Sequence, residues 1–259
     1  MSNLSGNLIA LHTIVRREIV RIMRIWTQTL IPPAITMTLY FVIFGKLIGS
    51  RIGTIQGGFT YMQYIVPGLA MMSIITNSYG NISSSFFGAK FQRSVEEMLV
   101  SPMSNWVILL GYVTGAVARG LVVGVLVLVI ALGFTSLHIQ HPLITLLSVL
   151  LGATIFSLAG FVNAIYAKKF DDIALVPTFV LTPLTYLGGV FYSVSMLGEP
   201  WQAISRVNPI LYMVNAFRYG VLGISDVQVG VAFAVMLAFV VVLSWLALNL
   251  LRRGVGLRS

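Results

Sequence analysis

Six long apolar stretches alternate with short polar segments along this chain of 259 residues. An α-helix rises about 1.5 Å per residue, so about 20 residues cross a hydrocarbon core of about 30 Å. Every stretch reaches that length. The pattern predicts an all-α polytopic membrane protein with six transmembrane helices, at residues 27–48, 61–87, 106–134, 143–167, 173–192 and 229–251.

Composition excludes a soluble protein. Hydrophobic residues make up 58% of the chain and charged residues 9%, whereas a soluble domain carries about 25% charged residues. Cysteine is absent, so neither disulfides nor thiolate chemistry is available. The net charge of +9 has to be interpreted loop by loop, and we expect no nucleic-acid partner.

The N-terminal segment, residues 8–26, is predicted to be an amphipathic helix lying in the membrane interface. It has no continuous apolar core before a small-residue cleavage site, so we expect no cleavable signal peptide. The helix is either a plain membrane-surface anchor or a surface that also touches a cytosolic partner through Arg17 and Arg21. Its apolar positions are Leu8, Leu11, Val15, Ile19, Ile22 and Trp26, and the predicted polar face carries Arg17, Arg21 and Arg24.

A charged interruption between the second and third spans predicts a short helix over residues 94–100. Ser94 and Glu97 have the spacing of a capping box, in which each side chain bonds the backbone N–H of the other. The helix is either a solvated connector or a docking helix on which a partner outside the membrane pushes. Its candidate contact residues are Ser94, Val95, Glu96, Glu97, Met98 and Leu99.

Basic residues place both termini in the cytosol, because cytoplasmic loops are enriched in lysine and arginine. Eleven basic residues lie on the side of the termini and four on the other side. The first group is Arg16, Arg17, Arg21, Arg24, Lys90, Arg93, Lys168, Lys169, Arg252, Arg253 and Arg258, and the second is Lys46, Arg51, Arg206 and Arg218.

The second cytosolic loop carries Asp171 and Asp172 just before the fifth span. Acidic side chains are stabilised at the N-terminus of a helix by its dipole. We interpret these two residues first as helix caps and second as contacts with a cytosolic partner.

Residues 196–220 break the pattern of long spans. Glu199-Pro200 and Asn208-Pro209 each open a helix, but each piece is too short to cross the membrane. A re-entrant helix pair that dips in from the external face accounts for its apolar character. Its candidate site residues are Trp201, Asn208, Pro209, Tyr212 and Arg218.

Polar residues inside the spans form another candidate set: Asn77, Asn81 and Arg119, with Tyr186 near the end of the fifth span. Asn77 and Asn81 either hold helices together or line a solvated pathway. Arg119 has three interpretations: it snorkels to an interface, it pairs with the second span where glycines thin its helix, or it attracts an anionic group in a pathway.

Three segments together resemble the signatures of the ABC type-2 permeases, the membrane subunits of ATP-driven exporters. They are the cytosolic KFQRSVEEMLVSPMSNWVILLGY, the PLTYLGGVFYS closing the fifth span and the external NPILYMVNAFRYG. The resemblance covers nearly the whole chain and is nearest to the small YadH-like bacterial inner-membrane permeases.

The resemblance implies a permease homodimer in the bacterial inner membrane with two copies of a separate ABC ATPase, which binds ATP–Mg. Residues 94–100 would be the coupling helix, residues 8–23 the connecting helix, and residues 200–219 would cap the outer end of the pathway. The first and fifth spans would line that pathway and meet the dimer mate. An amphiphilic, lipidic or drug-like substrate would move outward.

Other function classes find little support in the residues. No G-x-x-x-x-G-K-[ST] phosphate loop occurs, so this chain is expected to hydrolyse no ATP and to hold no cofactor. His138 and His141 have no acidic or cysteine companion for a metal site. A secondary transporter or channel is the alternative, yet ion coupling usually needs a carboxylate or histidine within the membrane. The acidic residues are expected near membrane faces or in loops.

Overall fold

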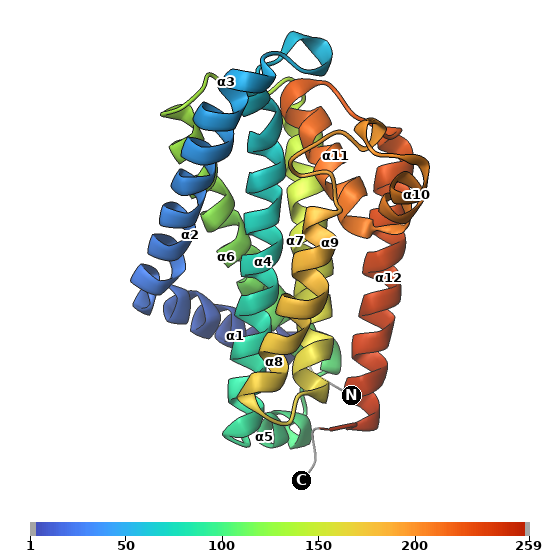
Figure 1. The fold of residues 1–259 in the computed structure, drawn as a ribbon. Helices are drawn as coiled ribbons and strands as arrows, with labels where there is room; N and C mark the ends of the chain where they lie inside the picture. Colours follow the sequence, from blue (N-terminus) through green and yellow to red (C-terminus); the bar gives the residue numbers. More distant parts are fainter. Residues whose placement is uncertain (1–3, 257–259) are drawn as a thin grey trace.

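The computed structural model describes residues 4–256, which fold into long, roughly parallel helices with shorter helices at both ends (Figure 1). Arg258 lies outside these residues. The first half comprises α1 (Leu4–Arg24), α2 (Trp26–Tyr40) with its π-helical continuation (Phe41–Ile48), α3 (Gly49–Ile52), α4 (Tyr61–Phe91), α5 (Ser94–Val100) and α6 (Asn105–Leu132). The second half comprises α7 (Pro142–Tyr166), α8 (Phe170–Val176), a π-helical segment (Pro177–Leu181), α9 (Thr182–Tyr186), α10 (Glu199–Val207), α11 (Pro209–Leu222) and α12 (Val229–Arg253).

Within residues 4–256, four helices are long and apolar enough to cross a membrane: Trp26–Ile52, Asn105–Leu132, Pro142–Tyr166 and Val229–Arg253. The predicted all-helical class is thus confirmed, together with these four candidate spans. The second predicted span lies in α4, which has 31 residues but a more polar sequence.

The fifth predicted span, 173–192, is wrong at its C-terminal end. The helical segments α8 to α9 stop at Tyr186, because the chain turns at Gly189 with a φ of +70°, a conformation that favours glycine. A Cβ atom on Gly188 would lie 2.7 Å from Ile210 Cγ2 of α11. Glycine therefore lets the exit from α9 pack tightly against α11.

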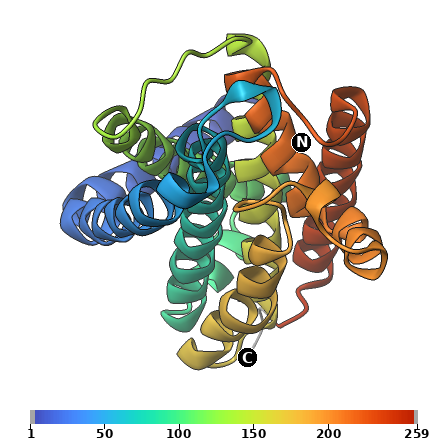
Figure 2. The ribbon, with the colours of Figure 1, turned by 45° about the horizontal axis from the view of Figure 1, so that its top comes forward.

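Helix α4 lies at the centre of the bundle, between α2 and α8–α9 and in contact with α6 and α7 (Figures 1 and 2). Small residues allow these contacts: a Cβ on Gly120 of α6 would lie 2.0 Å from Ser78 Oγ, and one on Gly160 of α7 would lie 2.7 Å from the Tyr79 carbonyl oxygen. Close approach at glycine is the usual basis of helix packing in membranes, where the hydrophobic effect drives no association.

The two ends of the bundle carry different short helices. Helix α1 lies across the bundle axis at the end that also holds α5, whereas α3, α10 and α11 gather at the opposite end (Figure 1). This places residues 8–26 and 94–100 together and separates them from residues 196–220. The candidate site residues of α1 and α5 thus lie at one end of the bundle and those of α10 and α11 at the other.

Candidate functional site

Helix α5 starts differently from the sequence prediction. The predicted capping box is absent: Ser94 Oγ donates a hydrogen bond to the Ala89 carbonyl oxygen at 3.0 Å, and the N-cap residue is Arg93, which has a left-handed φ of 61°. Because α4 ends only three residues before Ser94, the turn places Ser94 against the last turn of α4 instead of over its own helix. The hydroxyl therefore fixes α5 to α4.

The apolar side of α5 faces its own protein. Val95 is only 1% exposed, and Met98 and Leu99 pack against the same cluster of buried residues. Val95 is therefore not available to a partner, whereas Met98 and Leu99 are only half-buried and their contact with a partner stays a prediction. Glu97 is exposed and Val100 is 86% exposed, so these are the side chains that α5 presents outward.

A buried carboxylate that the sequence reading overlooked lies on α1. Glu18 is 1% exposed; it accepts hydrogen bonds from Ser85 Oγ of α4 at 2.7 Å and 2.8 Å and pairs with Arg21 at 3.0 Å. Arg17 lies 3.6 Å from the same carboxylate and donates to Tyr112 Oη of α6. The prediction that Arg17 and Arg21 face away from the packed side of α1 is therefore wrong.

The closeness of α1 to α6 explains why this acid is buried. A Cβ atom on Gly111 would lie 2.6 Å from Ile14 Cγ2, and one on Gly115 would lie 2.5 Å from Glu18 Cβ. The stripe that α1 buries consists of Ile14, Glu18 and Ile22, at i, i+4 and i+8. One sequence signal could have revealed the burial of Glu18. The acid lies at helical spacing between two isoleucines, and α6 carries two glycines four residues apart.

Two guanidinium groups from different helices converge on Asn81 of α4. Its Oδ1 atom accepts from Arg21 at 2.8 Å and from Arg119 of α6 at 3.5 Å. Asn81 itself is fully buried, and the Nε atoms of Arg21 and Arg119 are buried without a hydrogen-bond partner among the described residues. Arg119 thus contacts the polar part of the second predicted span, as its structural-pairing interpretation requires.

Asn77 lies one helical turn before Asn81 on α4, but its amide donates to the Ser73 carbonyl oxygen of its own helix at 3.0 Å. Tyr186 lies at the end of α9, where its hydroxyl is 3.5 Å from Tyr40 Oη of α2 and its ring stacks on Phe191. The structure thus brings Arg119 to Asn81, one turn from Asn77, whereas Tyr186 contacts Tyr40 and Phe191 instead.

The two acids in the first turn of α8 have different environments. Asp172 Oδ2 accepts from the backbone N–H groups of Lys168 at 2.7 Å and Lys169 at 3.0 Å. These hydrogen bonds stabilise the carboxylate and hold the pKa of Asp172 below its ordinary value. Asp171 is exposed. Asp172 therefore acts as a helix cap, as its first interpretation expected.

The opposite end of the bundle holds α10 and α11. Asn208 caps α11 by accepting from the Ile210 N–H at 3.0 Å, with Pro209 in the first turn. Tyr212 Oη donates to the Arg206 carbonyl oxygen at 2.7 Å, joining α11 to α10. Trp201 is 54% exposed.

Arg218 was expected among the external basic residues, but it is only 1% exposed. Its guanidinium lies 3.9 Å from the ring centroid of Tyr64 in α4 and donates to the Gly189 carbonyl oxygen at 2.6 Å. A buried arginine is costly unless such contacts compensate it. Arg218 therefore joins α11 to the irregular segment after α9.

Comparison with known proteins identifies the family. The model of the ABC-2 type transporter family matches residues 9–222, which include α1, α5, α10 and α11. The chain belongs to the ABC-2 type transporter family. The resemblance found in the three sequence segments is thereby confirmed.

Relatives of this ABC-2 permease include bacterial transport proteins. It is 58% identical to the "Inner membrane transport permease YadH" of Escherichia coli (strain K12) over 251 residues, covering 97% of this chain and 98% of the relative. It is also 28% identical to "Nodulation protein J" of Rhizobium meliloti (strain 1021) over 221 residues, covering 83% and 82%.

Membership fixes the general role. The chain is an ABC-2 permease of a transport system, a non-enzymatic membrane subunit, and permeases of this family generally pair with an ABC ATPase subunit. The candidate site of this permease consists of the surfaces and polar contacts that join α1, α4, α5 and α6.

Proposed function

We propose that this chain is the permease subunit of an ATP-driven exporter in the bacterial inner membrane. Two copies form a homodimer that binds two copies of a separate ABC ATPase, which holds ATP–Mg. The substrate is amphiphilic, lipidic or drug-like and moves outward. Each copy crosses the membrane six times, with both termini in the cytosol.

The attachment of α5 carries this proposal. Val95 is buried, Ser94 is bonded to the last turn of α4, and Glu97 and Val100 face outward. A push on the outward side of α5 would reach α4 directly, because no flexible linker separates the two helices. The missing phosphate loop requires that the push come from another polypeptide.

The lengths of two further segments support six crossings. Helix α4 has 31 residues and would span about 46 Å. Helix α8, the π-helical segment and α9 follow one another from Phe170 to Tyr186, and the loop between α7 and α8 lies at the α5 end of the bundle (Figure 1). Both segments run along the bundle beside the four candidate spans.

The aromatic contacts between α2 and the exit of α9 support a pathway beside these helices. The ring of Phe191 lies 4.9 Å from that of Phe44 and 5.8 Å from those of Tyr40 and Tyr186. Aromatic side chains with polar tips suit a surface that amphiphilic molecules cross. The first and fifth spans are therefore the proposed pathway and dimer surfaces.

A secondary transporter is the second candidate, and Glu18 is the observation that favours it. Ion coupling uses carboxylates that are shielded from bulk water, and Glu18 is buried. The Glu18 carboxylate, however, accepts hydrogen bonds from Arg21 and from Ser85, so it serves to join α1 to α4. The ATP-coupled function is therefore preferred.

The two candidates differ in a direct assay. The chain is purified alone and again after co-expression with a candidate ABC ATPase subunit, and ATP turnover is measured in lipid vesicles. We expect no turnover by the chain alone, a stable complex with the ATPase, and transport that stops when ATP is withdrawn. Substrate transport driven by a proton gradient without ATP would instead establish the secondary transporter.

A further inference from the structure

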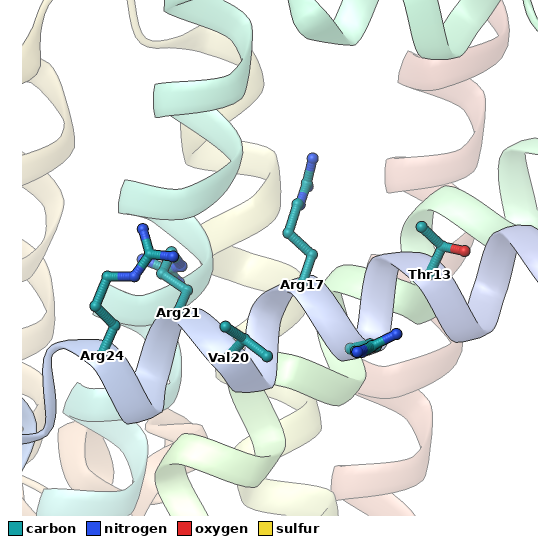
Figure 3. Close-up of a pocket in the computed structure, with 6 residues that line it drawn as sticks. Thr13, Arg17, Val20, Arg21 and Arg24 are labelled. Carbon is teal, nitrogen blue, oxygen red and sulfur yellow. The ribbon is translucent and has the colours of Figure 1, made fainter.

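A basic cleft runs along α1 at the end of the bundle that holds α5. It has a volume of about 510 Å³ and is lined by Thr13, Arg16, Arg17, Val20, Arg21 and Arg24. Arg17, Arg21 and Arg24 project from the same side of α1 (Figure 3). The volume suits a small-molecule headgroup.

Positive charge in this cleft exceeds what the protein neutralises. Glu18 pairs with Arg17 and Arg21, whereas Arg16 and Arg24 are exposed and form no ion pair with any other described residue. The guanidinium of Arg119 also lies close to that of Arg21, because both groups donate to Asn81 Oδ1. An anion in the cleft would compensate this excess.

The surroundings of the cleft favour a lipid over an acidic protein surface. Val20, which lines the cleft, is 47% exposed, and Met23 and Trp26 beside it are 68% and 55% exposed. Exposed apolar side chains next to arginines are typical of helices that lie among lipid headgroups. Trp26 is the first residue of a candidate span. Tryptophan is enriched at this position because the ends of spans lie at the membrane–water interface.

We propose that this cleft binds the phosphate of an anionic phospholipid from the cytoplasmic leaflet. Arg16 and Arg24 supply guanidinium donors that have no other partner among residues 4–256, and Arg17 and Arg21 supply their remaining donors. A guanidinium fork matches phosphate geometry and can bond it bidentately. The bound lipid would hold α1 beside α4 and α6, and this inference rests on the proposed cytosolic side of α1 but not on coupling to ATP.

The test compares two double variants that lose the same charge at the same end of the bundle. Arg16→Gln with Arg24→Gln removes the two unpaired arginines of the cleft, whereas Arg252→Gln with Arg253→Gln removes two exposed arginines from the end of α12. Binding of phosphatidylglycerol and of phosphatidylcholine to the full chain in detergent is measured by native mass spectrometry. Monodisperse gel filtration of each variant verifies folding.

We expect the wild type and the α12 variant to prefer phosphatidylglycerol equally. The cleft variant should bind it roughly tenfold to thirtyfold more weakly, since each basic residue contributes about fivefold near an anionic surface. An equal loss in both variants, or equal binding of phosphatidylcholine and phosphatidylglycerol by the wild type, would overturn the proposal.

Two further arms identify the source of the anion and exclude a protein ligand. Millimolar inorganic phosphate should leave lipid binding unchanged; full displacement would show that the cleft takes free phosphate instead. Co-purification with the ATPase is measured for the same variants. A cleft variant that keeps its lipid but loses the ATPase would assign these arginines to the partner and refute the lipid site.

Discussion

At the scale of single residues, the decisive group is Glu18. The sequence pattern predicts an apolar face on α1 at Leu8, Leu11, Val15, Ile19, Ile22 and Trp26, and this face does not include Glu18. The buried stripe instead includes Glu18, because Gly111 and Gly115 let α1 approach α6. The spacing of apolar residues alone could not show which side of α1 is buried. That side is set by the position of the small residues on the neighbouring helix α6.

Replacing Glu18 by glutamine should destabilise the protein. The change keeps the shape of the side chain but leaves Arg17 and Arg21 without their carboxylate. Breaking a buried ion pair costs about 3–5 kcal/mol, and we expect the lower end because the Arg21 side chain remains 29% exposed. The measurement is the thermal transition of the detergent-solubilised chain, followed by gel filtration.

Asp171→Asn is the matched control for that change, since Asp171 is an exposed acid at the same end of the bundle. It should alter the stability by no more than about 0.5 kcal/mol. Equal transition temperatures for wild type and Glu18→Gln would show that the buried carboxylate has no structural role.

At the scale of elements, helix positions followed from the sequence better than helix faces did. Apolar length predicted the helices near residues 106–134, 143–167 and 229–251, because a membrane span is defined by its own composition. The capping box at Ser94 failed because the turn after α4 orients that hydroxyl towards Ala89. A capping box does form at Thr60 and Gln63, at the start of α4, where the same spacing went unnoticed.

The orientation of α5 predicts opposite effects for its two valines. Val100→Asp places a charge on the outward side and should weaken ATPase association by about thirtyfold, as expected for the loss of one interface anchor. Val95→Ala should lower the folding stability on the order of 1–3 kcal/mol, because it opens a cavity in the core. Co-purification and thermal transitions measured on both variants separate the two effects.

The reverse pattern, with Val95→Ala losing the ATPase at unchanged stability and Val100→Asp showing no change in binding, would mean that α5 docks by its apolar side. Met98→Ala provides a second inward-facing control, since Met98 packs against the same buried cluster as Val95.

At the scale of the whole molecule, polar contacts join the elements that must move together. Helix α4 contacts α5 through Ser94, α1 through Ser85 and Asn81, and α11 through Tyr64 and Arg218. These contacts connect both ends of the bundle. The sequence identified most of the polar residues but not their partners, since pairs such as Arg21 and Asn81 lie 60 positions apart.

The central claim is that an ATPase outside the membrane moves α5 of two permease copies. The chain has no cysteine, so Gln92→Cys, exposed just before α5, accepts one spin label per copy. The distance between the two labels is measured by double electron–electron resonance in the complex with the ATPase, with ADP and with ATP. We predict one defined distance that shifts with ATP and does not shift without the ATPase. Identical distances in both nucleotide states, in a complex that turns over ATP, would contradict the account.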